Sequence, residues 1–166
     1  MVAGNRTGLI ETGFYRSPIG WMEIRAGGDA LISILFCDES LVEDKKHDGI
    51  IIEAVRQLNC YFQDGSFVFD LPLVSPSTEF QAMIRQAMMR IQPGEVKTYR
   101  QMAVSTGNPQ ASRAVGRAAA TNPLMIVVPC HRVVGSGGQL TGYAGGLERK
   151  KWLLEHEANG LTFQLK

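Results

Sequence analysis

The sequence is poor in the residues that build disulfide frameworks and metal sites. Its 166 residues hold only three cysteines and three histidines, all widely spaced and without a Cys-x-x-Cys pair. Disulfide scaffolds and thiolate zinc sites need such residues in clusters. We therefore expect neither a metal nor a cofactor. The six residues are Cys37, Cys60, Cys130, His47, His131 and His156.

Long apolar runs are also missing. No stretch approaches the roughly 20 apolar residues of a membrane-spanning helix, and residues 1–20 lack the apolar core of a signal peptide. With 45% hydrophobic and 20% charged residues, the composition is that of an ordinary soluble globular protein. We expect a cytoplasmic protein without a membrane partner, built as one domain or two small ones.

The net charge is only +1, but its distribution along the chain is uneven. Residues 1–78 hold six Lys and Arg against eleven Asp and Glu, whereas residues 79–146 hold seven against two. Such an asymmetry indicates a surface that faces a polyanion. Taken alone, it is explained equally well by a solvated face.

The N-terminal third has the pattern of short β-strands. Three runs rich in β-branched and aromatic residues cover 9–17, 20–27 and 30–38, and Pro and Gly separate them. An amphipathic helix follows, with an apolar stripe that ends near Asp64-Gly65. Its members are Ile51, Val55, Leu58 and Phe62. Residues 66–73 are interpreted as one more strand, and residues 74–77 (VSPS) as a linker.

The second half has helical patterns instead. Thr78 and Gln81 fit a capping box, and an apolar stripe runs from there to Pro93-Gly94. The stripe consists of Phe80, Met83, Ile84, Ala87, Met88 and Ile91. A last helix is expected from Leu147 to about Asn159, ended by Gly160.

Two short helices with a tight turn lie between these segments. Thr98 and Gln101 form a second capping box, Gly107 closes the first short helix, and Asn108 with Pro109 opens the next. This is the helix-turn-helix pattern. The second helix carries Arg113 and Arg117 among Ala and Gly. Although a plain core helix would also fit, the basic surroundings favour DNA binding.

Together these patterns predict an α+β fold of two domains. Residues 1–76 would form an N-terminal domain with a small antiparallel β-sheet and a helix. Residues 77–166 would form a C-terminal helical domain with the helix-turn-helix and the segment PCHRV (129–133).

Cys130 and His131 stand side by side where an apolar, strand-like run ends at Pro129. The thiolate is the nucleophilic form of cysteine, and a neighbouring base activates it. Neighbours on a strand point to opposite faces, so either the strand ends at Pro129 or a water bridges the two groups. The alternative is a buried structural cysteine beside a core histidine. A carboxylate that orients His131 would come from Glu148, Glu155 or Glu157.

Residues 122–157, NPLMIVVPCHRVVGSGGQLTGYAGGLERKKWLLEHE, closely resemble the O6-alkylguanine-DNA alkyltransferase family, whose signature is PCHRV. Residues 79–123 match as well, through GEVKTY and RAVG. Residues 10–72 match more loosely, through SPIG and a β-rich N-terminal domain followed by a helix. The strong resemblance thus covers roughly residues 78–158.

The resemblance implies four roles around the cysteine. Cys130 would accept the alkyl group, and His131 would take the thiol proton through a water. Glu157 would orient His131. Asn122 would be the hinge residue that ties the segment before Cys130 to the helix-turn-helix.

The resemblance also implies three roles in flipping and holding the target nucleotide. Arg113 would fill the space that the flipped nucleotide leaves in the duplex. Tyr99 would crowd the 3′ phosphate of the target nucleotide. Tyr143 would line the base pocket with its hydroxyl near the guanine.

Three further residues would contact the DNA backbone. Arg100 and Asn108 lie at or near helix N-termini, where backbone amides favour phosphates, and Ser136 lies in the loop after the active site.

The implied activity is DNA repair by direct reversal: one irreversible transfer of the alkyl group from O6-alkylguanine in double-stranded DNA to Cys130. O4-alkylthymine is the second expected substrate. The partner would be damaged duplex DNA, bound by a monomer, with cooperativity left open. One alternative function is a sensor that binds alkylated DNA without repairing it. Another is a cysteine hydrolase that completes many catalytic cycles.

Overall fold

The computed structural model describes residues 8–44, 46–47 and 49–158, and no helix among them is long and apolar enough to cross a membrane. The predicted α+β fold is confirmed. Three antiparallel strands form one sheet in the order β1-β2-β3. They are β1 (Ile10–Ser17), β2 (Gly20–Gly27) and β3 (Ala30–Phe36), and each coincides with a predicted run.

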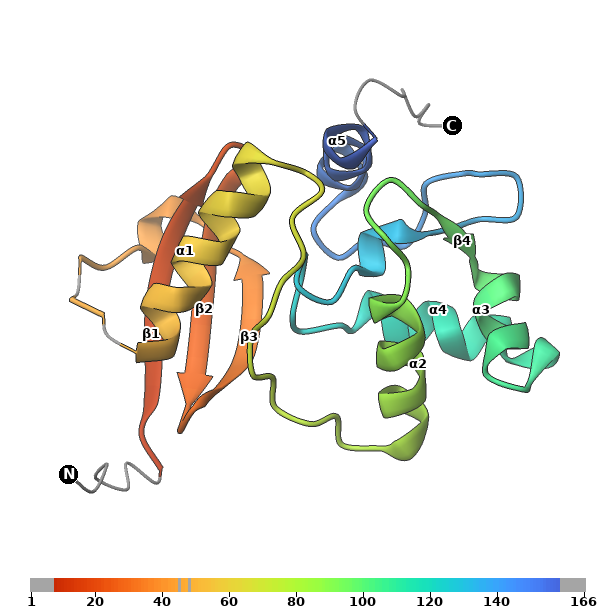
Figure 1. The fold of residues 1–166 in the computed structure, drawn as a ribbon, viewed down its shortest axis with the longest axis horizontal. Coiled ribbons are helices and arrows are strands. Elements are labelled where there is room, and N and C mark those ends of the chain that lie inside the picture. The colour runs from red at the N-terminus through yellow and green to blue at the C-terminus, as the bar shows by residue number, and fades with distance from the viewer. Residues whose placement is uncertain (1–7, 45, 48, 159–166) are drawn as a thin grey trace.

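Helix α1 (Gly49–Gln63) covers one face of this sheet (Figure 1). It can approach closely because β1 has a glycine there: a Cβ at Gly13 would lie 2.5 Å from the Ile51 side chain. Of the predicted stripe, Ile51 and Leu58 are buried, whereas Val55 and Phe62 are half-buried against the core. The helix also buries Ala54, Gln57 and Tyr61.

The prediction of a strand over residues 66–73 is wrong. Only one isolated bridge, Leu31 to Leu73, joins this segment to the sheet. Two features of the sequence prevent a ladder. Pro72 has no N–H, and the Gln57 amide pairs with both the N–H and the C=O of Asp70, each at 2.8 Å. The alternating apolar residues reflect an extended segment that packs one side against the core.

Residues 74–78 are irregular and lead into the C-terminal part of the chain. Helix α2 (Glu79–Met89) begins at the predicted cap, because Thr78 Oγ1 accepts from the Gln81 N–H at 3.2 Å. The Gln81 side chain accepts from Ser77 instead of from the cap, so the predicted capping box is only half formed. The stripe of α2 buries Ile84 and Met88 and leaves Met83 exposed.

The helix-turn-helix prediction is confirmed. Helix α3 (Tyr99–Ser105) starts at a complete Thr98–Gln101 capping box. After Gly107, whose φ of +80° suits a residue without Cβ, Asn108 caps a 3₁₀ turn η2 (Pro109–Ala111) that continues into helix α4 (Ser112–Ala120).

A short parallel pair joins this unit to the PCHRV segment. Strand β4 (Lys97–Thr98) pairs with β5 (Val133–Val134), so the chain entering α3 lies beside the residues that follow His131. No pattern in the sequence predicts this pair, because two residues are too few to show a period.

The expected strand before Pro129 does not form. Residues 124–128 turn back on themselves, with Val128 N–H donating to Leu124 C=O at 2.9 Å. Ile126 has a φ of 71°, a left-handed conformation that β-branched residues rarely adopt. The run is apolar because it is buried on all sides, not because it belongs to a sheet.

Helix α5 (Leu147–Glu157) is the last described element, and it lies above the junction of the two parts of the chain (Figure 1). Its buried face consists of Lys150, Leu153, Leu154 and Glu157. The predicted end at Asn159 and Gly160 lies outside the described residues.

Candidate functional site

Cys130 opens a single 3₁₀ turn, η3 (Cys130–Arg132), directly after Pro129, and is only 4% exposed. The Asn122 amide donates to its Sγ at 3.1 Å and to the Val128 carbonyl at 3.0 Å. Asn122 Oδ1 also accepts from the Leu124 N–H. One side chain at the end of α4 therefore holds the turn of residues 124–128 and touches the thiol.

His131 is completely buried and faces a carboxylate. Its Nε2 lies 2.7 Å from Glu157 Oε1, which comes from the last turn of α5. A charged carboxylate only accepts hydrogen bonds, so Nε2 carries the proton. The other ring nitrogen, Nδ1, is buried without a partner, and in a neutral ring it is the acceptor that remains available.

Glu157 is the centre of a larger network. Its two oxygens also accept from the Tyr61 hydroxyl at 2.7 Å and from the Arg132 guanidinium at 2.8 and 2.9 Å. Burial raises the pKa of Glu157, but His131 and Arg132 outweigh it and hold the pKa well below its usual range. The carboxylate is therefore charged at neutral pH and fixes the imidazole.

The thiol and the imidazole are both neutral at rest. Burial raises the pKa of Cys130, although the Asn122 hydrogen bond and the Lys150 charge oppose the shift. Burial lowers the pKa of His131 against the opposing effect of Glu157. A neutral thiol beside a neutral imidazole with a free acceptor nitrogen is an arrangement that forms a thiolate when a proton moves to the base.

Tyr143 supplies a hydroxyl to the same region. The side chain is buried, and its Oη has no hydrogen-bond partner. Burial and the nearby Cys130 raise its pKa well above the usual value. The hydroxyl thus stays protonated and is free to donate to a bound group, which is what an unsatisfied buried polar atom suggests.

Lys150 is a residue that the sequence analysis missed. It is 0% exposed, and its Nζ donates to the Val133 carbonyl at 2.6 Å and to the Thr141 carbonyl at 2.8 Å. Tyr99 donates to the same Thr141 carbonyl at 3.0 Å. Burial lowers the pKa of Lys150 to about 8. The sequence held one signal for its burial. Lys150 is the first and Glu157 the last residue of an i, i+3, i+4, i+7 stripe on α5.

Tyr61 and Arg132 were also overlooked as site residues. Tyr61 lies outside the stripe predicted for its helix, and Arg132 was given no role within the PCHRV segment. Both side chains hydrogen-bond to Glu157, which is distant from them in the sequence. Hydrophobic periodicity describes single elements and does not predict such long-range contacts.

The predicted DNA contacts lie outside this buried cluster. Arg113 and Arg117 are exposed on α4, and Arg100 is exposed in the first turn of α3. Asn108 is exposed while its Oδ1 caps η2, and Ser136 is exposed in the loop that follows β5. Tyr99, predicted to crowd the 3′ phosphate, and Tyr143, predicted to line the base pocket, both lie near Cys130.

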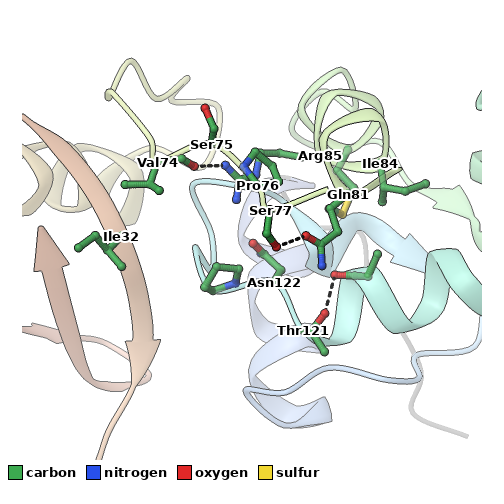
Figure 2. A pocket seen from close by; sticks show the side chains of 13 residues that line it. Ile32, Val74, Ser75, Pro76, Ser77, Gln81, Ile84, Arg85, Thr121 and Asn122 are labelled. Atoms are coloured by element: carbon green, nitrogen blue, oxygen red, sulfur yellow. Dashed lines mark hydrogen bonds between the residues drawn. The ribbon is translucent and has the colours of Figure 1, made fainter. Parts of the chain in front are cut away.

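Asn122 also lines a cavity of about 330 Å³ at the junction between the linker, α2 and the end of α4. Figure 2 shows Arg85 reaching across this cavity to the Val74 carbonyl and Ser77 bonded to Gln81. The residue that touches the thiol therefore lines the same cavity as the segment that links the two parts of the chain.

Two family models match the chain. The one described as 6-O-methylguanine DNA methyltransferase, DNA binding domain, covers residues 79–159. The one described as 6-O-methylguanine DNA methyltransferase, ribonuclease-like domain, covers residues 10–74.

Relatives and solved structures agree with these models. A methylated-DNA–protein-cysteine methyltransferase of Methanosarcina barkeri is 42% identical and covers 97% of this chain and 91% of its own. One of Mycobacterium leprae is 41% identical over 90% and 93%. A crystal structure of Mycobacterium tuberculosis O6-methylguanine methyltransferase is 36% identical over 92% and 95%, with a TM-score of 0.80. A structure of the M. tuberculosis protein in complex with DNA is 38% identical over 89% and 93%, with a TM-score of 0.78.

Proposed function

Because the chain belongs to the 6-O-methylguanine DNA methyltransferase family, we propose that Cys130 is the residue that takes the alkyl group. The protein repairs DNA by moving an alkyl group onto one of its own cysteines, the activity that its relatives' names state. Of the three cysteines, Cys130 has a histidine–carboxylate pair beside it.

The single observation that carries this assignment is the buried chain of groups from Asn122 through Cys130 and His131 to Glu157. The thiol proton moves to His131 Nδ1 through a bridging water, and the imidazolium that forms is stabilised by Glu157. The thiolate sulfur then attacks the alkyl carbon. The carbon–oxygen bond breaks, and its electron pair stays on the guanine. The base then takes up one proton on its ring nitrogen and recovers the neutral lactam form, which balances the proton that the thiol released.

Tyr143 is the proton donor in this proposal. Its unpartnered hydroxyl would stabilise the charge that develops on the guanine oxygen or on a ring nitrogen. The product is a thioether, and it offers no acyl carbon for water to attack. Each molecule therefore acts once, and Cys130 stays alkylated.

The base must leave the stack to reach a cysteine that is almost completely buried. Flipping costs a few kcal/mol. Arg113, exposed on α4, fills the gap in the duplex, and Tyr99 helps to turn out the target nucleotide. Arg100, Asn108 and Ser136 contact the phosphate backbone, which fits their exposure.

The proposed partner is duplex DNA that contains O6-alkylguanine, with O4-alkylthymine as a second substrate. The protein would act as a monomer in the cytoplasm and lie on the nucleoid when bound. We propose two domains, residues 1–76 and residues 77–166, of which the second holds both the helix-turn-helix and the alkyl acceptor.

Intact-mass measurement after incubation with excess duplex containing O6-methylguanine tests the proposal. We expect one added methyl group per chain, located at Cys130 by peptide mapping. The Cys130→Ser variant should bind the duplex and gain no methyl. A wild-type protein that binds the lesion but stays unmodified would indicate a damage sensor, and one that releases free product repeatedly would indicate a hydrolase.

A further inference from the structure

Arg149, in the first turn of α5, joins its own preceding loop to two places in the N-terminal sheet. Its Nε donates to the Ile19 carbonyl at 2.8 Å, in the turn between β1 and β2. Its Nη1 donates to the Gly145 carbonyl at 3.1 Å. The guanidinium carbon lies 4.3 Å from the centre of the Phe36 ring, at the end of β3.

The turn between β1 and β2 is shaped to receive this side chain. Gly20 has a φ of +128°, and a Cβ on it would lie 2.8 Å from Arg149 Nη2. A side chain at this position would therefore force the guanidinium to shift, and the φ of Gly20 already disfavours any residue with a Cβ. Two carbonyl groups and an aromatic face surround one cation, an arrangement that gives charge-assisted hydrogen bonds and a cation–π contact.

The loop that Arg149 holds is the loop that carries Tyr143. Gly146 N–H donates to the Tyr143 carbonyl at 3.0 Å and closes the turn. Gly145, inside the turn, is packed between two rings: a Cβ there would lie 2.6 Å from Tyr143 and 3.0 Å from Phe36. Gly145 thus lies between the Tyr143 and Phe36 rings and leaves no room there for a side chain.

We propose that Arg149 is a positioning residue for alkyl transfer, which holds the loop of residues 143–146, and with it Tyr143, against the N-terminal part of the chain. The inference rests on the proposed function, because it assigns a role in the reaction at Cys130. It also gives the N-terminal sheet a part in the chemistry, through Ile19 and Phe36.

Without Arg149, the Gly145 carbonyl loses its side-chain donor and the link to β1–β2 is gone. The turn then moves relative to Phe36, and the Tyr143 hydroxyl moves with it. A misplacement of about 1 Å at a reacting centre costs up to roughly 100-fold in rate. Because the packing against Phe36 remains, we expect a smaller loss of about tenfold, equivalent to ~1.4 kcal/mol in the barrier.

The main variant is Arg149→Met, which keeps a long side chain and removes both donors and the charge. Its matched control is Arg16→Met, at an exposed arginine that lies over Trp21 at 5.9 Å within the N-terminal part. The rate of methyl transfer is measured with a methylated duplex and with the free base O6-benzylguanine. Duplex affinity is measured separately in a Cys130→Ser background.

We expect Arg149→Met to lose about tenfold in rate on both substrates, with duplex affinity unchanged within about twofold and Arg16→Met equal to wild type. Arg149→Lys keeps the positive charge and an ammonium group that can donate to one of the two carbonyls, so it should recover part of the rate. The rates are compared at a temperature where all variants are folded. Under that condition, a difference in folding stability would not explain why Arg149→Lys reacts faster than Arg149→Met.

Phe36→Leu provides a second test if Arg149→Met does not fold. It removes the ring under the guanidinium and should lower the transfer rate in the same way on both substrates. Equal rates for wild type and these variants would overturn the inference, as would a parallel loss of duplex affinity, which would make Arg149 a DNA contact. If wild type itself transfers no methyl to Cys130, the proposed function fails instead.

Discussion

At the scale of single residues, the candidate site depends most on one carboxylate. Glu157 accepts hydrogen bonds from Tyr61, His131 and Arg132 in a region that excludes solvent. Removing one partner of such a buried ion pair leaves the other charge uncompensated. The same carboxylate fixes which nitrogen of His131 is available to a proton, so stability and reactivity depend on it together.

Glu157→Gln should lower the free energy of unfolding by about 3 kcal/mol near neutral pH, because Arg132 stays buried without its counterion. In the wild type, the pKa of Glu157 is lowered in the folded state from an ordinary value of 4.5. Its contribution is therefore present above that value and is lost as the pH falls below it. Urea unfolding over a series of acidic pH values should show a shallower pH dependence for the variant.

Glu53→Gln is the control for this prediction. Glu53 also pairs with an arginine, Arg56, but both side chains are largely exposed. Its replacement should change stability little, since solvent screens an exposed pair. If both variants gave the same acid profile as the wild type, Glu157 would not be the group responsible for acid sensitivity.

Alkylation itself should destabilise the protein. The Cys130 sulfur is nearly inaccessible and lies 3.1 Å from Asn122 Nδ2, so an added methyl group has to displace its surroundings. Overpacking a core in this way costs about 1–3 kcal/mol. We expect a lower melting temperature after one equivalent of methyl transfer, measured by thermal unfolding. Cys130→Ser protein treated with the same duplex should show no change.

At the scale of elements, the helix-turn-helix is directly connected to the buried site around Cys130 and His131. β4 leads into α3 and pairs with β5, which directly follows η3. At the other end, Asn122 follows α4 and touches Cys130. The reactive turn is therefore held from both ends of the pair of helices, which explains how a helix on the surface can be aligned with a buried thiol.

Arg113→Ala should slow repair of duplex DNA by about tenfold or more, if the side chain offsets ~1.4 kcal/mol of the flipping cost. The same variant should react normally with O6-benzylguanine, which needs no flipping. Arg117→Ala, one turn further along the exposed face of α4, is the matched control and should affect only binding. An equal loss on duplex and free base would contradict the role of Arg113 in the gap.

At the scale of the whole molecule, the two parts of the chain differ in charge and in task. The acidic N-terminal part supports the loop that carries Tyr143, through Arg149 and Phe36. The basic C-terminal part holds the thiol and presents α4 to solvent. The basic C-terminal part can therefore face a polyanion, while the acidic N-terminal part packs against the loop that carries Tyr143.

Binding to duplex DNA should weaken steeply as salt rises, since each phosphate that a Lys or Arg neutralises releases counterions. With about four such contacts, the slope of log K against log salt would be about −3.6. Arg100→Ala should make the slope shallower by about one. Titrations at several salt concentrations measure both values. A slope near zero would mean that the basic surface does not bind the phosphate backbone.

Local sequence signals were enough for much of the fold. The alternating runs predicted β1, β2 and β3, and the Thr98–Gln101 and Gly107–Asn108 patterns predicted the helix-turn-helix, because capping and turns depend on neighbours in the chain. The same reasoning failed for residues 66–73 and 124–128. There, burial and side-chain bonds to the backbone produce apolar patterns, and only isolated bridges to β3 form, at Leu73 and Leu124.

By itself, the sequence determined the chemical identity of the site: a cysteine next to a histidine, a carboxylate on the last helix, and a family signature around them. Only the tertiary structure decided which groups meet. Tyr61 and Arg132 converge on Glu157, Lys150 holds two carbonyls behind the cysteine, and Arg149 reaches the N-terminal sheet. The physical reason is that each of these contacts joins segments distant in the chain, whereas periodicity and capping report only on neighbours.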